Sequence, residues 1–150
     1  MSIPDFVMIP EKLQDLIETL SLIEDRNERI QYLISLSESF RPPPTEIASK
    51  PYPEERRVPG CESAAFEFSA LRADGTKDFY FAVENPQGVS AMALAEILHE
   101  TLSGARAEEI AQVPEDVIYE IFGNELSMGK SMGLMGMVRM LKADSARMQP

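Results

Sequence analysis

Two alternating segments on either side of a short turn constrain the fold of this chain more than any other feature. Residues 64–70 alternate apolar side chains with polar or small ones, and residues 77–84 repeat the pattern. A period of two is typical of a half-buried strand. The Ala-Asp-Gly-Thr sequence of residues 73–76 favours a hairpin turn between them. We therefore predict an antiparallel hairpin with one aromatic face, formed by Phe66, Phe68, Phe79 and Phe81.

Helical patterns precede this hairpin. Pro10 can open a helix, because its missing N–H costs nothing in the first turn, and apolar residues recur after it at helical spacing. Asp25 and Glu28 resemble a capping box that starts a second helix, which the prolines at 42–44 end. We expect the two helices to form an antiparallel helical hairpin, with residues 1–9 as an extended lead-in.

More helices are predicted after the hairpin. Asn85 and Pro86 form a cap followed by a first-turn proline, and shorter helices are expected around 106–111 and 114–122. Ser127 can cap the last helix, and residues 143–150 are expected to be a frayed tail. These C-terminal helices are the available cover for the aromatic face of the sheet.

A proline-rich connector occupies residues 42–59, and we interpret it as a surface segment. A short edge strand near Arg57 and Val58 would make the antiparallel sheet three-stranded. The sequence thus predicts an α+β fold: an N-terminal helical hairpin, a small three-stranded sheet and C-terminal helices over it. A length of 150 residues suits a single domain spanning 1–150.

Composition and charge exclude several function classes. With 14 Lys and Arg against 25 Asp and Glu, the net charge of −11 argues against a nucleic-acid partner, which requires a concentrated positive patch. No apolar run approaches the ~20 residues that span a bilayer, so no membrane partner is expected. The N-terminus lacks the features of a signal peptide, and a cytoplasmic location is expected.

The chain has one cysteine, Cys61, and one histidine, His99. A single cysteine excludes an internal disulfide and a Cys-x-x-Cys pair, and these two residues alone cannot hold zinc or an iron–sulfur cluster. Pro59 and Gly60 favour a tight turn that displays the Cys61 thiol. Arg56 and Arg57 near this turn would favour a thiolate, whereas the neighbouring Glu62 would oppose it. Both a reactive thiol and an inert, packed one remain open from these residues alone.

Three further features allow a functional interpretation and a structural one. His99 is expected on the exposed side of its helix. Lys130, in the first turn of the last helix, opposes the helix dipole, which indicates either an anionic neighbour or a solvated lysine. Helically spaced methionines indicate adaptable packing or a partner surface rather than a soft-metal site; they are Met128, Met132, Met135, Met137 and Met140.

Two motifs resemble those of the SufE family, the sulfur-acceptor partners of cysteine desulfurases. Residues 58–63, Val-Pro-Gly-Cys-Glu-Ser, resemble the family's Gly-Cys-x-Ser signature, and residues 130–134, Lys-Ser-Met-Gly-Leu, resemble its Arg-x-x-Gly-Leu. The resemblance implies a SufE/NifU-like fold in which Cys61 accepts persulfide sulfur. The positions that match its neighbours and the second motif are Gly60, Glu62, Ser63 and Lys130.

The resemblance also implies the partners. A SufS-like cysteine desulfurase, which carries its own pyridoxal phosphate, would donate sulfur and be stimulated, and a SufBCD-like iron–sulfur assembly scaffold would receive it. This chain would need no cofactor and no metal, only a covalent persulfide on Cys61, and would be a sulfurtransferase-like accessory protein rather than a free-standing enzyme. In the family, the unloaded cysteine loop tucks against an apolar surface and swings out to react.

The chain departs from the family pattern at three places. Phe66 stands where tryptophan is frequent, Ser90 and Ala91 stand where a basic residue and glycine are common, and Lys130 replaces arginine. Two other functions are considered: an iron–sulfur scaffold or carrier of the NifU-like fold, and a structural adaptor of a desulfurase with an incidental cysteine. The first would need several cysteines, whereas this chain has one.

Overall fold

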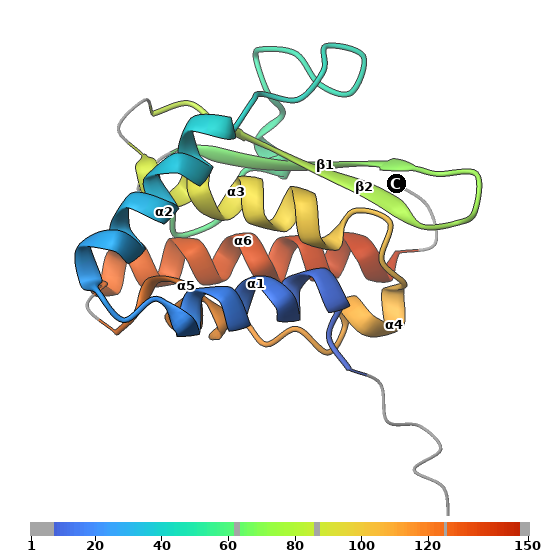
Figure 1. Cartoon of the computed structure of the whole chain (residues 1–150). Coiled ribbons are helices and arrows are strands. Elements are labelled where there is room, and N and C mark those ends of the chain that lie inside the picture. Colours follow the sequence, from blue (N-terminus) through green and yellow to red (C-terminus); the bar gives the residue numbers. More distant parts are fainter. Residues whose placement is uncertain (1–7, 62–63, 86–87, 125, 148–150) are drawn as a thin grey trace, which may run out of the picture.

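The computed structural model describes residues 8–61, 64–85, 88–124 and 126–147 (Figure 1). It contains the predicted hairpin: strand β1 (Ala65–Leu71) pairs antiparallel with strand β2 (Lys77–Val83). The turn between them uses Gly75 at φ +91°, a conformation that favours glycine. Asp74 accepts a hydrogen bond from the Thr76 N–H at 2.9 Å, which fixes the turn.

The expected third strand is reduced to one bridge. Within the described ranges the sheet has two strands, and Arg57 forms an isolated antiparallel bridge to Phe66. The 3₁₀ helix η1 (Glu54–Arg56) lies immediately before Arg57, and Pro59, which has no N–H, follows two residues after it. Only Arg57 and Val58 are therefore left to extend beside β1, which is too short for a strand.

The prediction of one aromatic face is wrong, because the aromatic residues occupy both faces of the hairpin. Phe68 pairs with Tyr80, whereas Glu67 pairs with Phe81. Directly opposed residues share a face, and neighbours along a strand lie on opposite faces. The register set by the turn thus places Phe66 with Phe68 and Tyr80 on one face, and the two β2 phenylalanines on the other.

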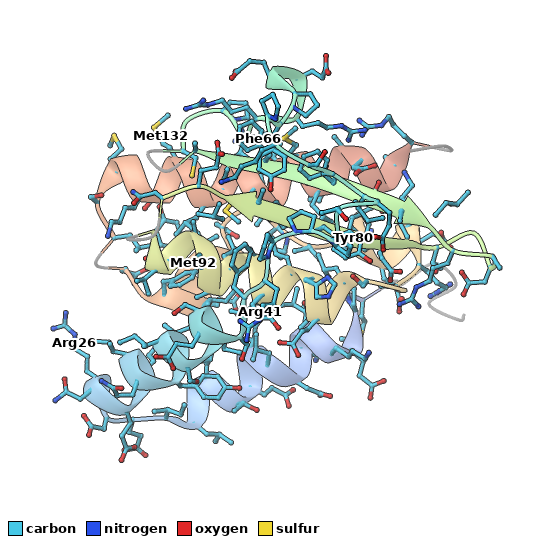
Figure 2. The ribbon with its side chains drawn as sticks, turned by 90° about the horizontal axis from the view of Figure 1, so that it is seen from above. Arg26, Arg41, Phe66, Tyr80, Met92 and Met132 are labelled. Carbon is cyan, nitrogen blue, oxygen red and sulfur yellow. The ribbon has the colours of Figure 1, made fainter. Side chains whose placement is uncertain are left out.

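Each face of the sheet has its own cover. Helices α3 (Val89–Leu102) and α6 (Met128–Ala146) pack under the face with Phe79 and Phe81. The connector covers the opposite face: the Tyr52 ring lies 5.2 Å from that of Phe66 and 5.6 Å from that of Phe68. Figure 1 shows the connector above the sheet, and Figure 2, seen from above, shows Phe66 and Tyr80 there.

The N-terminal helices are α1 (Glu11–Leu22) and α2 (Arg26–Ser39), and the contacts of the described residues do not confirm the expected antiparallel pairing between them. Instead α2 packs on α3, and α1 contacts α3 and α5 (Val117–Phe122). Near the start of α2, the Arg29 guanidinium donates to the carbonyls of Leu20 in α1 and Ile121 in α5 at 3.0 and 2.8 Å, which links the three helices. Figure 1 shows α2 rising toward the sheet while α1 stays in the lowest layer.

The remaining helical predictions hold with shifted ends. Helix α4 (Ala107–Ile110) and α5 correspond to the two short helices that were expected. Helix α3 begins at Val89 with Gly88 as N-cap, later than Asn85 indicated. Helix α6 continues to Ala146, so residues 143–146 are helical rather than part of a tail, and Asp144 is fully buried. None of the helices described is long and apolar enough to span a bilayer.

Candidate functional site

The predicted turn places the single cysteine against the core. Val58 is buried, and its N–H donates to the carbonyl of Ala65 at 2.7 Å, which closes the base of the loop that carries Cys61. Gly60 adopts φ +77°, the left-handed conformation that a Pro-Gly turn requires. Cys61 is half-buried and packs against the main hydrophobic core. The thiol is therefore neither fully displayed nor fully enclosed.

Cys61 forms part of the wall of a cavity of about 200 Å³. The other walls come from the loop and first turn of α3, at Asn85 and residues 88–91, and from the start of α6, which includes Lys130 and Gly133. A volume of this size has room for a sulfur atom added to the thiol, since one liquid water occupies about 30 Å³. The fold thus brings together residues 61 and 130, from the two separate motifs.

The electrostatics of this cavity favour an anion. The N-terminal ends of α3 and α6 both lie in its walls, and the positive end of a helix dipole is at the N-terminus. Ser127 caps α6 by accepting from the Lys130 N–H at 3.2 Å, whereas Gly88 gives α3 no side-chain cap. The Lys130 side chain adds a positive charge at the rim. A thiolate in this cavity is therefore in a favourable field, although the chain as a whole is acidic.

The structure describes some of the predicted site residues and not others. Gly60 and Cys61 form the turn, and Lys130 is an exposed residue on the wall of the same cavity. Glu62 and Ser63 lie outside the described residues. Two methionines of the predicted set are also exposed at the start of α6: Met128 at 80% and Met132 at 53%, the latter labelled in Figure 2.

The contribution of α3 to the cavity was missed by sequence reasoning. Ser90 and Ala91, noted only as departures from a family pattern, form part of its wall. The signal available in the sequence was the small residues Gly88, Ser90 and Ala91, which let a helix end approach another segment closely. Nothing in the local pattern indicates which segment that is.

A buried ionisable cluster at the far end of α6 was also missed. Glu67 and Asp144 are fully buried, and Lys77 is 5% exposed. The Lys77 ammonium donates to the Asp144 carbonyl and carboxylate at 2.6 and 3.1 Å. Arg56 reaches this pair from the connector, with its Nη1 3.8 Å from Glu67 Oε1 and 3.9 Å from Asp144 Oδ2. The cluster therefore ties the connector to β1, β2 and α6.

The surroundings shift the pKa values of the two carboxyl groups of this cluster in opposite directions. Burial, followed by the hydrogen bond and negative charge of Asp144, raises the pKa of Glu67 to about 10. Burial alone would raise the pKa of Asp144 too, but hydrogen bonds from Glu67 and Lys77 outweigh it and lower that pKa. At neutral pH Glu67 is thus a neutral donor and Asp144 an anion, paired with the cations around it.

His99 departs from its expected exposed position. It is half-buried, its Nδ1 lies 2.6 Å from the Phe79 carbonyl oxygen, and its ring lies 5.2 Å from that of Tyr80. It is not part of the wall of the cavity beside Cys61. Its contacts connect α3 to β2, which is a structural role.

The fold and the site together define a class: a small α+β protein with one thiol at a cavity between two helix ends. Residues 14–145 match the family model SufE, Fe-S metabolism associated domain, so the chain belongs to this family. The chain is also similar to the solution structure of a hypothetical protein from Thermus thermophilus. The TM-score is 0.72 at 24% identity over 92% of this chain and 96% of that one, which shows a common fold. No curated protein matches.

Proposed function

We propose that this protein accepts persulfide sulfur on Cys61 from a SufS-like cysteine desulfurase, stimulates that enzyme, and passes the sulfur to a SufBCD-like iron–sulfur assembly scaffold. Membership of a family associated with Fe-S metabolism supports the general role. The observation that carries the finer proposal is the position of Cys61 in the wall of an anion-favouring cavity with room for one more sulfur.

The transfer needs one nucleophile and no redox partner. The Cys61 thiolate attacks the outer sulfur of the donor's persulfide, so a new S–S bond forms at Sγ. The S–S bond within the donor breaks, and the donor thiolate leaves with its electron pair. The oxidation state of the transferred sulfur is unchanged. The same exchange with an acceptor thiolate of the scaffold would unload the protein.

The surroundings of Cys61 fit each stage of this exchange. The ends of α3 and α6, with Lys130, favour the attacking thiolate and later the persulfide anion. Cys61 is the only cysteine, so no second thiol in the chain can collapse the persulfide into an internal disulfide. We place the reaction in the cytoplasm, where a lone thiol stays reduced. The chain itself would need no metal or cofactor.

An activity assay separates this function from that of an adaptor. Alanine release from cysteine by a cysteine desulfurase is measured with and without the protein. If the protein is a sulfur acceptor, the wild type should stimulate alanine release and the Cys61→Ser variant should not. Equal stimulation by both would support an adaptor whose cysteine is incidental, and would contradict the proposal.

A further inference from the structure

The loop that carries Cys61 lies directly on two glycines of α6. A Cβ atom on Gly133 would lie 2.8 Å from the Cys61 Cα and 3.3 Å from the Gly60 carbonyl oxygen. A Cβ atom on Gly136, one helical turn along, would lie 2.7 Å from the Pro59 carbonyl oxygen. Carbon atoms do not approach backbone atoms this closely, so any side chain at either position would force the loop to move.

These glycines have no advantage for the helix itself. Both lie inside the 19-residue α6 and are buried, whereas glycine in a helix interior is less favourable than alanine. Their benefit is therefore in the contact they permit. Together Gly133 and Gly136 form a flat surface that we call the glycine seat, and the backbone of residues 59–61 rests on it.

The base of the loop has contacts in addition to those with the glycine seat. The Val58 Cγ1 would lie 3.1 Å from a Cβ atom on Gly136, but Val58 is also 1% exposed and its N–H donates to the Ala65 carbonyl. Arg56 lies beside the buried carboxyl pair. A displacement of residues 59–61 from the seat would therefore leave the Val58–Ala65 hydrogen bond and the β1–β2 pairing in place.

We propose that the glycine seat positions Cys61. It holds the thiol at the wall of the cavity in the resting state, and its contact with the loop determines how often the thiol is exposed to a reagent or partner. Gly133 is the main positioning residue, because it faces Cys61 itself, and Gly136 supports the preceding peptide. The biological role of this positioning rests on the proposed sulfur-acceptor function. The contact between the loop and the two glycines does not.

The test is the rate at which iodoacetamide alkylates Cys61 under native conditions, measured by intact mass, with unfolding followed by circular dichroism. Gly133→Ala should alkylate about tenfold faster than wild type, which corresponds to ~1.4 kcal/mol at the seat. Gly136→Ala should change the rate in the same direction. Ala143→Gly is the matched control: it weakens α6 at an exposed position away from the loop, and its alkylation rate should equal that of wild type.

Three results would overturn the proposal. The first is a folded Gly133→Ala protein that alkylates at the wild-type rate. The second is an Ala143→Gly protein that alkylates as fast as Gly133→Ala, because helix stability rather than the seat would then control the thiol. The third is unfolding of both glycine variants, because displacement of the loop from the seat would then require the whole domain to unfold. None of these readouts needs a desulfurase. A wild-type protein that takes up no sulfur would therefore refute the proposed function without affecting the inference about the glycine seat.

Discussion

Replacing Glu67 by glutamine should remove a large pH dependence of stability. The native pKa of Glu67 is raised to about 10 from an ordinary 4.5, chiefly by burial and then by its hydrogen bond to Asp144. Between these values the folded chain holds a proton that the unfolded chain has lost. The free energy of unfolding therefore falls as pH rises, by about 1.4 kcal/mol per pH unit.

Between pH 6 and pH 8 this slope amounts to roughly 3 kcal/mol from Glu67 alone. Asp144 adds nothing to it, because its pKa is lowered and its stabilising contribution is lost only as pH falls below its ordinary value of 3.8. Burial and Glu100 raise the pKa of Glu96 to about 7, which gives a smaller decline of the same sign. Both wild type and Glu67→Gln contain Glu96, so its contribution cancels when the two proteins are compared.

The assay is urea unfolding of wild type and variant at pH 6, 7 and 8. Glutamine has the shape of the protonated acid and can still donate to Asp144, so Glu67→Gln should lose the slope and gain stability relative to wild type as pH rises. Glu115→Gln is the control: it removes an exposed carboxylate whose pKa Arg139 lowers, and it should leave the slope intact. Equal slopes for wild type and Glu67→Gln would refute the raised pKa of Glu67.

Three further substitutions test other parts of the structure. Gly60→Ala should destabilise the fold by about 1 kcal/mol, measured by thermal unfolding, because φ +77° is unfavourable for alanine, and no loss would contradict the turn geometry. Tyr52→Ala should cost about 2 kcal/mol in urea unfolding by uncovering Phe66 and Phe68, and a change below about 0.5 kcal/mol would mean that the connector is not a cover. Lys130→Ala should slow sulfur uptake roughly two- to fivefold by removing a positive charge near the thiolate, and Lys130→Arg should retain the rate. Unchanged uptake in the alanine variant would leave Lys130 a solvated side chain.

Local patterns predicted the elements of this fold better than their contacts. The alternation of residues 64–70 and 77–84 and the turn at residues 73–76 predicted the hairpin of β1 and β2, because period and turn chemistry are local properties. Which face each aromatic residue occupies depends on the register across the turn, where a shift of one residue exchanges the faces. For that reason the two-sided cover, with the connector over Phe66, was not foreseen.

The same limit applies to the site. A Pro-Gly turn predicts where Cys61 sits along the chain, and the motifs indicated that Lys130 belongs with it. That Ser90, Gly133 and Gly136 complete the surroundings depends on packing between distant segments. The buried Glu67 is the clearest failure: alternation marked it as a polar position of the strand, and only the arrival of Asp144 from α6 explains a carboxyl group there.

The central claim is tested most directly by the intact mass of the protein after incubation with a cysteine desulfurase and cysteine. We expect the wild type to gain one sulfur atom, the gain to be reversed by a reductant, and the Cys61→Ser variant to gain none. A wild-type protein that stays at its original mass while the desulfurase turns over would contradict sulfur acceptance by Cys61.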